Sequence, residues 1–313
     1  MERTLGSSGI TVSAVGLGCN NFGRKGTLTE GLAGTRRVLD AAIDHGITFL
    51  DTADMYGVPP TTSETLMGEA LKGKRDEVVL ATKWGHSAFP IPGTEAWGPK
   101  GAEGYIRRAV DDSLQRLQTD FIDLYQLHTP DPDTPIADTI AVLDDLVRAG
   151  KIRTYGHSNF SAAQIREAEA VETPNGFVTA QNEYSLLQRE AEQEVLPAAA
   201  AAGLGFLPYF PLANGLLTGK YSRDERPSGS RLTDLKPQLL EDANWDALER
   251  YRAAVESWGI TMLEATFGWL LGQRPVISVI AGATREEQIA GNAAAGRTEL
   301  SDEQLEEISR IFA

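Results

Sequence analysis

The sequence predicts a (β/α)8 barrel formed as a single domain by residues 1–313, and three observations predict it. Eight short runs rich in β-branched residues alternate with longer segments whose apolar residues recur at helical spacing. Helical crossovers between successive strands require parallel pairing, and eight such units close into a barrel. The alternative, an open doubly wound sheet, would carry G-x-G-x-x-G after its first strand, where this chain reads GLGCNNFG.

The expected barrel strands are short apolar runs bounded by glycine, proline or polar residues. They are SAVGLG from Ser13, ITFLD from Ile47, VVLATK from Val78, FIDLYQLH from Phe121, IRTYGHS from Ile152, FVTAQN from Phe177, GFLPYF from Gly205 and VISVIAG from Val276. One intervening helix is defined in detail by SETLMGEALKG, in which Ser63 is the expected N-cap and Gly73 the expected terminator.

Two segments fall outside this repeat. MERTLGSSGITV, before the first barrel strand, is typical of a β-hairpin with SSG as its turn, and we expect it to close the bottom of the barrel. The segment from Asn214 to about Asn244, after the seventh strand, is longer than an ordinary loop. Its position after a barrel strand favours a functional role.

The composition argues against some classes of binding partner. A net charge of −15 argues against nucleic acid and anionic membrane surfaces, which are bound by concentrated lysine and arginine. Cys19 is the one cysteine and cannot form an intramolecular disulfide. No apolar run approaches the ~18 residues of a membrane span, and no basic and apolar leader opens the chain, so the expected location is the cytoplasm.

Polar residues stand at the C-terminal ends of successive expected strands. They are Asp51, with Tyr56 in the loop after it, then Lys83, His128, the pair Ser158 and Asn159, and the pair Gln181 and Asn182. Taken singly, each of these residues has an ordinary structural explanation, as a loop cap, a solvated charge or a core histidine. Their shared placement predicts one site, because the βα loops of a barrel converge at this end.

The first four of these residues suit proton donation to a carbonyl oxygen. A tyrosine has an unperturbed pKa of about 10, and a neighbouring lysine ammonium lowers it. Lys83 is the candidate for that lysine beside Tyr56, and Asp51 would keep the ammonium charged and oriented. His128 could hydrogen-bond the substrate oxygen. The electrons would have to come from a cofactor.

Short motifs in a fixed order cover nearly the whole chain. They are DTADMYG with SETLMGEAL, LATKWG, DLYQLHTPD, YGHSNFS, QNEYSLLQRE, PLANGLLTGKY and IAGATREEQIAGN. In this order and spacing the chain resembles the aldo-keto reductase superfamily, in particular bacterial NADP-dependent members, closer to the branch of channel β subunits. The resemblance implies that Asp51, Tyr56, Lys83 and His128 form a catalytic tetrad, with Tyr56 as the general acid that reduction of an aldehyde or ketone requires.

The resemblance also implies a cofactor site. Around the nicotinamide it would use Gly18, Cys19, Asn20, Asp51, Ser158, Asn159 and Gln181, with Tyr209 stacked on the ring. Along the pyrophosphate and the adenosine it would use Phe210, Pro211, Leu212, Gly215, Leu216, Gly219, Lys220, Gly282, Arg285, Gln288 and Asn292. Because the planar Arg285 guanidinium could meet a 2′-phosphate, NADPH is expected rather than NADH.

Three positions depart from the family pattern. Phe210 stands where a small polar residue usually contacts the pyrophosphate, and Gly291 stands where glutamate is common near the adenine. His157 replaces a small apolar residue, and its imidazole needs a partner or solvent.

Aromatic residues are expected to line the substrate pocket. Phe22 and Trp84 would form an apolar wall beside Tyr56 and His128, with Phe89 or Trp97 as further candidates. No basic cluster marks a phosphorylated or carboxylated substrate.

Two other functions were weighed against carbonyl reduction. One is a cofactor-binding regulatory subunit with weak turnover, which would not require the intact tetrad. The other is a metal-dependent barrel hydrolase that uses His128, Asp131 and Asp133. The four histidines include no close pair, and the two aspartates alternate with prolines as in a turn before a helix. No metal is therefore expected.

Overall fold

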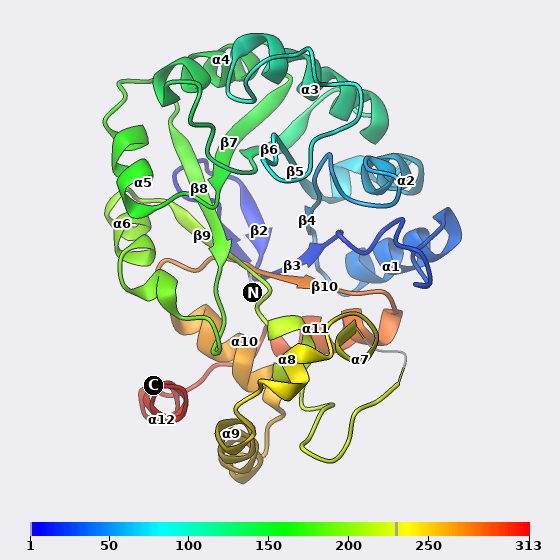
Figure 1. The fold of residues 1–313 in the computed structure, drawn as a ribbon, viewed down its shortest axis with the longest axis vertical. Coiled ribbons are helices and arrows are strands. Elements are labelled where there is room, and N and C mark those ends of the chain that lie inside the picture. The colour runs from blue at the N-terminus through cyan, green and yellow to red at the C-terminus, as the bar shows by residue number, and fades with distance from the viewer. Residues whose placement is uncertain (1, 229–230) are drawn as a thin grey trace.

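The computed structural model describes residues 2–228 and 231–313, and it has the predicted barrel. Eight parallel strands form one sheet in the order β10-β3-β4-β5-β6-β7-β8-β9, with helices packed around the outside (Figure 1). The barrel strands are β3 Val15–Gly18, β4 Phe49–Asp51, β5 Val79–Trp84, β6 Ile122–Leu127, β7 Ile152–Ser158, β8 Phe177–Glu183, β9 Gly205–Tyr209 and β10 Val279–Gly282. Their C-terminal ends meet at one rim.

The barrel closes between β9 and β10 through a short contact. Phe206 and Val276 form an isolated parallel bridge. The Phe206 N–H donates to Pro275 O at 3.0 Å, and the Ile277 N–H donates to Phe206 O at 3.0 Å. The strand expected from Val276 is therefore divided into this bridge and β10.

The outer helices bury apolar faces against the barrel. They are α1 Leu32–Asp44, α2 Thr62–Ala70, α3 Glu103–Leu117, α4 Ile136–Arg148, α5 Ala162–Glu169, α6 Val195–Ala201, α9 Trp245–Ser257, α10 Met262–Gly272, α11 Glu286–Ala295 and α12 Asp302–Ile311. Single 3-10 turns are η1 Arg75–Glu77 and η2 Glu190–Glu192. Thr261 and Glu264 form a capping box that starts α10, with reciprocal side-chain to backbone hydrogen bonds of 3.2 and 2.7 Å.

The start of α2 differs from the prediction. Thr61 occupies the N-cap position, and Ser63 lies inside the helix, so the prediction of Ser63 as N-cap is wrong. The reason is tertiary: the buried Ser63 hydroxyl donates to Cys19 O at 3.0 Å and lies 2.9 Å from Thr52 Oγ1. At the other end, the helix ends at Ala70 with Leu71 as its C-cap, and the expected terminator Gly73 follows two residues later with a left-handed φ of +78°.

The predicted N-terminal hairpin closes the bottom of the barrel. Strands β1 Glu2–Thr4 and β2 Thr11–Ser13 pair antiparallel. Hairpin and strand side chains form one buried cluster inside the barrel, made of Leu5, Ile10, Val12, Phe49, Ala81, Leu124, Val178, Leu207 and Ile280. Ser13 ends the hairpin rather than starting the first barrel strand, because its hydroxyl accepts the Thr48 and Phe49 N–H groups at 3.1 and 3.2 Å.

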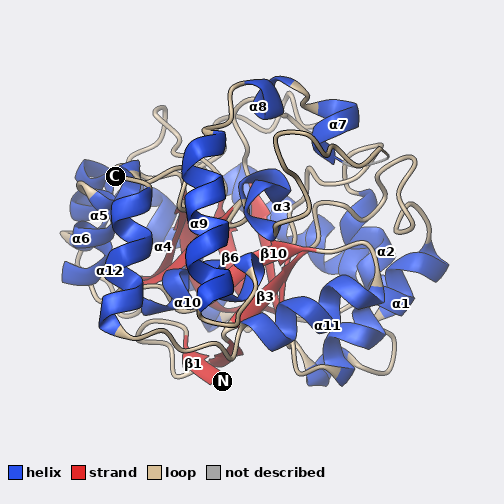
Figure 2. Ribbon diagram, turned by 90° about the horizontal axis from the view of Figure 1, so that it is seen from below, coloured by secondary structure: helices blue, strands red, loops and turns tan. Residues whose placement is uncertain are grey.

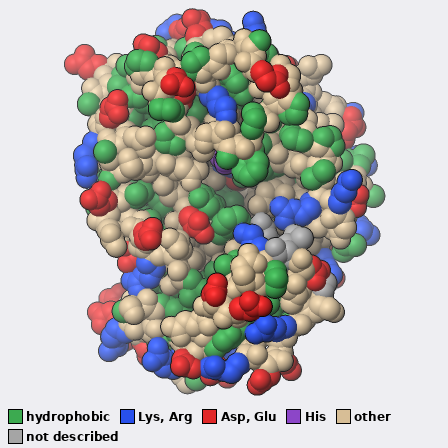
Figure 3. Space-filling model, in the orientation of Figure 1, with side chains coloured by type: hydrophobic (Ala, Val, Ile, Leu, Met, Phe, Trp, Pro, Cys, Tyr) green, Lys and Arg blue, Asp and Glu red, His purple; other side chains and the backbone are tan. Residues whose placement is uncertain are grey.

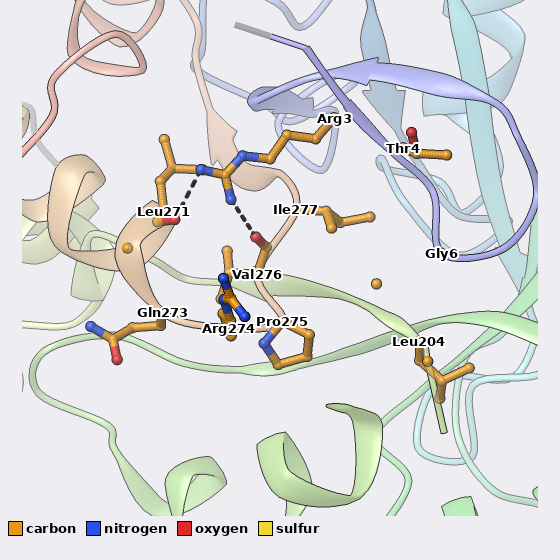
Figure 4. A pocket seen from close by; sticks show the side chains of 13 residues that line it. Arg3, Thr4, Gly6, Leu204, Leu271, Gln273, Arg274, Pro275, Val276 and Ile277 are labelled. Atoms are coloured by element: carbon orange, nitrogen blue, oxygen red, sulfur yellow. Dashed lines mark hydrogen bonds between the residues drawn. The ribbon is translucent and has the colours of Figure 1, made fainter. Parts of the chain in front are cut away.

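Arg3 ties the hairpin to the barrel at this end. Its guanidinium donates to Val276 O at 2.7 Å and to Leu271 O at 3.0 Å, so it caps the C-terminus of α10 (Figure 4). A cavity of about 450 Å³ lies beside these contacts. It is on the opposite side of the barrel from the βα loops.

The long segment after β9 lies at the other end from the hairpin. It contains the 3-10 segment η3 Ala213–Thr218 and two short helices, α7 Arg231–Leu235 and α8 Gln238–Glu241. Figure 2 shows α7 and α8 at one end of the molecule and β1 at the other. Within the described ranges, no helix is both long and apolar enough to cross a bilayer.

His157 is packed without a polar partner between the barrel and its helices. The side chain is 0% exposed, and neither ring nitrogen has a hydrogen-bond partner. Its ring stacks on Phe160 at 4.2 Å and meets Phe177 edge to face at 5.1 Å. Burial lowers the pKa of His157 to about 3.

We expect His157→Leu to raise the free energy of unfolding by about 1–3 kcal/mol at pH 7, because it removes an unsatisfied buried polar group. The gain should increase on acidification. The unfolded His157 takes up a proton below its usual pKa of about 6.5, whereas the folded one stays neutral, so native stability falls by about 2 kcal/mol between pH 7 and pH 5. His157→Leu lacks this loss.

Urea unfolding at pH 7 and pH 5 measures the effect. The exposed His45 provides the control: His45→Leu should change stability by less than about 0.5 kcal/mol at either pH. A destabilised His157→Leu protein would mean that the imidazole has a polar partner, such as a buried water.

Candidate active site

A buried ion pair between Asp51 and Lys83 forms the base of the candidate site. Asp51 ends β4 and Lys83 lies near the end of β5, so adjacent strands bring the two side chains together. Asp51 Oδ2 and Lys83 Nζ are 2.6 Å apart, and the lysine side chain is 0% exposed. The ammonium also donates to Thr52 O at 2.9 Å. Such a pair is tolerated in the interior only when further hydrogen bonds satisfy its remaining atoms.

Two glutamine side chains satisfy the other oxygen of Asp51. The Nε2 atoms of Gln126 and Gln181 each donate to Asp51 Oδ1 at 3.1 Å. Gln126 is not among the residues predicted from the sequence. Strand alternation is the signal that identifies it, because Gln126 stands two residues before His128 and therefore faces the same side of β6.

Tyr56 lies in the β4–α2 loop between Lys83 and His128. Lys83 Nζ is 5.3 Å from the centroid of the Tyr56 ring. The rings of Tyr56 and His128 meet edge to face, with centroids 5.8 Å apart. The structure therefore brings the four side chains of the predicted tetrad into one group. Figure 3 shows that this face of the molecule is hollowed near its middle, with a histidine side chain at the edge of the hollow.

The net shift of the Tyr56 pKa is upward, although Lys83 was expected to lower it. Burial raises this pKa, and Lys83 opposes the rise through its charge and a hydrogen bond without reversing it. Lys83 therefore lowers the pKa of Tyr56, as predicted, but desolvation of the phenolate is the larger effect. Tyr56 is therefore protonated at neutral pH and can donate a proton.

Lys83 and His128 have different charge states. Burial alone would lower the pKa of Lys83, but Asp51 and Tyr56 together raise it, so the lysine stays charged. Burial, reinforced by the charges of Lys83 and Lys100, holds the pKa of His128 well below its usual range. A neutral His128 can donate a hydrogen bond without adding a charge. The site thus has two neutral donors beside one ammonium.

The residues predicted around the nicotinamide are linked to this group. Ser158 Oγ donates to Gln181 O at 2.8 Å, and the Asn159 N–H donates to the same oxygen at 2.9 Å. The Tyr209 hydroxyl donates to Asn159 Oδ1 at 2.8 Å. Asn159 Nδ2 in turn donates to His128 O at 2.9 Å. The ends of β7, β8 and β9 therefore form one hydrogen-bonded surface next to the tetrad.

The end of β3 lies against the opposite side of Asp51. Gly18 pairs with Asp51 on one side and with Gly282 on the other. The Cys19 N–H donates to Asp51 O at 2.8 Å. The Cys19 thiol is fully buried, and burial raises its pKa well above the usual range. A Cβ added at Gly282 would lie 3.8 Å from Asn20 Oδ1, so these predicted residues adjoin one another.

The predicted pyrophosphate segment has an unusual backbone. Left-handed φ angles occur at Phe210 (+50°), Ala213 (+46°), Asn214 (+59°), Gly215 (+108°) and Gly219 (+82°). For residues other than glycine such angles cost about 1–3 kcal/mol each and concentrate at functional sites. In the same segment Asn214 Oδ1 is buried without a hydrogen-bond partner. Pro211 and Leu216 are buried, Leu212 is half-buried, and Lys220 is exposed.

The predicted adenosine residues lie at the start of α11 and along it. Arg285 is the exposed N-cap residue. Gln288 Oε1 accepts the Thr284 N–H at 2.9 Å, which occupies one of its polar atoms. Asn292 is 5% exposed, and Gly291 before it is half-buried.

Two aromatic residues expected in the substrate wall lie elsewhere. Trp84 is 0% exposed and stacks on Tyr125 with ring centroids 4.3 Å apart. The reason is strand alternation: Lys83 points into the barrel, so the next residue faces the helices. Phe22 is also 0% exposed, within the main core. Neither side chain presents surface to the rim.

Known proteins similar to this chain match almost its whole length. The model of the aldo/keto reductase family matches residues 14–313. An uncharacterized oxidoreductase, YrpG, of Bacillus subtilis (strain 168) is 36% identical over 322 residues, which cover 100% of this chain and 96% of the relative. L-glyceraldehyde 3-phosphate reductase of Escherichia coli (strain K12) is 32% identical over 327 residues, with coverages of 99% and 92%. Probable aldo-keto reductase 1 of Glycine max is 33% identical over 309 residues, with coverages of 97% and 86%.

Proposed function

Because this chain belongs to the aldo/keto reductase family, we propose that it is a cytoplasmic enzyme that reduces an aldehyde or ketone to an alcohol with NADPH. The observation that carries the proposal is the protonated Tyr56 beside the buried Lys83 and Asp51 pair. This arrangement places a transferable phenolic proton next to a fixed positive charge, and a carbonyl oxygen needs both as it gains electrons.

Each member of the tetrad has a separate task. NADPH, when bound, supplies the hydride that reaches the carbonyl carbon. Tyr56 donates its hydroxyl proton to the carbonyl oxygen as that oxygen gains the electron pair of the broken C=O π bond. Lys83 stabilises the phenolate that remains, and Asp51 keeps Lys83 charged and in place. Neutral His128 orients the carbonyl oxygen by a hydrogen bond.

The residues predicted for the cofactor suit a dinucleotide. Ser158, Asn159 and Gln181 would meet the carboxamide, and Tyr209 would stack on the ring. The left-handed backbone of residues 210–219 and the unpartnered oxygen of Asn214 support a bound group there, because such strain and unsatisfied atoms are rare without a ligand. The exposed Lys220 and Arg285 supply positive charge for phosphates.

Arg285 is proposed to select NADPH over NADH through the 2′-phosphate. We expect Arg285→Ala to weaken NADPH binding about tenfold and NADH binding much less, since a charge-assisted hydrogen bond contributes about 1.5–3 kcal/mol. Fluorescence titration with both nucleotides measures this. Arg297→Ala removes another exposed arginine and should leave both affinities unchanged. Equal weakening of both nucleotides would contradict the role.

The direct test of the function combines binding with turnover. Purified protein is titrated with NADPH, and absorbance of the reduced nicotinamide is then followed with a panel of aldehydes and ketones. Carbonyl-dependent NADPH oxidation supports the proposal. Tight binding without turnover on any carbonyl would favour a cofactor-binding regulatory subunit instead, and no binding of either nucleotide would overturn the cofactor assignment.

A further inference from the structure

A line of four rings leads from solvent to the proposed general acid. Phe89 is 58% exposed in the segment between β5 and α3. Its ring centroid is 4.9 Å from that of His86, which is 4.6 Å from that of His128. The His128 ring is 5.8 Å from that of Tyr56. Phe89, His86, His128 and Tyr56 therefore form a continuous ring wall beside the hollow.

The outer end of the ring wall lies in an apolar part of the rim. Among the described residues, the large hydrophobic side chains that are most exposed are Leu28 at 56%, Val58 at 54% and Phe89 at 58%. They belong to the loops after β3, β4 and β5, all on the face that carries Tyr56. Hydrophobic side chains border the hollow in Figure 3, together with Lys and Arg side chains. Exposed apolar groups gathered beside a catalytic site are typical of a ligand-binding surface.

The ring wall is also electrically neutral. Burial and the charge of Lys100 lower the pKa of His86, and His128 is neutral as well. The cations that act on His128 are already engaged. Lys83 is paired with Asp51, and the Lys100 ammonium donates to His86 O and interacts with the charges of Asp54 and Asp131. The four rings themselves therefore offer a phosphate no positive charge.

We propose that the ring wall selects substrates with an aromatic or bulky apolar group next to the carbonyl, and that Phe89 and His86 are its specificity-determining residues. The inference rests on the proposed reductase function and names its substrate class. The flat apolar group would lie along Phe89 and His86 while the carbonyl oxygen meets Tyr56 and His128. Aromatic contacts of this kind add stabilisation beyond the apolar area that they bury.

The test compares an aldehyde that has an aromatic ring with one that has a phosphate group. NADPH oxidation is measured with benzaldehyde and with glyceraldehyde 3-phosphate, and the selectivity is the ratio of their kcat/KM values. We expect the native protein to favour benzaldehyde by at least about tenfold, because its ring packs against the ring wall, whereas glyceraldehyde 3-phosphate has no apolar group to place there. A ratio near one, or in favour of the phosphate, would overturn the assignment.

Substitutions in the ring wall then test whether its residues determine this selectivity. Phe89→Ala should lower the ratio about fivefold to tenfold, chiefly through a higher KM for benzaldehyde. Phe89→Tyr and His86→Phe keep a ring in place and should preserve it, whereas His86→Ala should lower it. Val171→Ala is the control, since the half-buried Val171 lies between α5 and β8, at the end of the barrel opposite the βα loops.

These experiments distinguish a failure of the ring-wall proposal from a failure of the proposed reductase function. An unchanged ratio in Phe89→Ala, or an equal loss in Val171→Ala, would refute the ring wall while leaving the reductase intact. Absence of NADPH oxidation with either aldehyde and with the wider carbonyl panel would remove the reductase function, and the substrate assignment with it.

Discussion

Tyr56→Phe should lower kcat by roughly 10²–10⁴-fold, because it removes the one proton that the tetrad transfers to the carbonyl oxygen. NADPH affinity should change by less than about twofold, since the loss of one hydroxyl leaves the cofactor contacts in place. Steady-state kinetics with benzaldehyde and fluorescence titration with NADPH measure the two effects separately.

Tyr125→Phe is the matched control for this variant. The Tyr125 hydroxyl is buried and has no hydrogen-bond partner, and its ring stacks on Trp84 away from the rim. Its removal should leave kcat unchanged and stability equal or slightly higher. Full activity in Tyr56→Phe would exclude Tyr56 as the proton donor, and loss of NADPH binding would assign it to the cofactor site instead.

Lys83→Met should cost about 3–5 kcal/mol of unfolding free energy and most of kcat. The substitution leaves the Asp51 carboxylate buried without its cation, and an uncompensated buried charge is strongly destabilising. It also removes the group that stabilises the Tyr56 phenolate during proton transfer. Urea unfolding and steady-state turnover report the two losses.

The double variant Asp51→Asn with Lys83→Met separates the effect of Lys83 on stability from its effect on turnover. Neutralising both partners removes the unpaired charge, so much of the lost stability should return while kcat stays low. Gln126 and Gln181 can still donate to the remaining amide oxygen at position 51. If turnover returned together with stability, the pair would be structural and would take no part in the chemistry.

Tertiary contacts also explain where the predictions of individual residues were wrong. Ser63 has the chemistry of an N-cap, but its hydroxyl is engaged by Thr52 and Cys19 from other strands. Trp84 has the aromatic character of a pocket residue, but it follows the inward-facing Lys83, and adjacent residues of a strand face opposite sides. A shift of one residue along a strand thus moves a side chain from the rim to the helix layer.

The sequence by itself determined the barrel, the closing hairpin and the strand ends that carry Asp51, Lys83 and His128. Periodic apolar runs define each strand and helix locally, and the barrel architecture then brings all strand ends to one rim. Only the tertiary structure decided how the site is charged. Gln181 and Asp51 are 130 residues apart in the chain but 3.1 Å apart in space, and the burial that raises the pKa of Tyr56 and lowers that of His128 comes from many surrounding residues. Desolvation depends on everything that surrounds a group, and a local pattern does not contain that information.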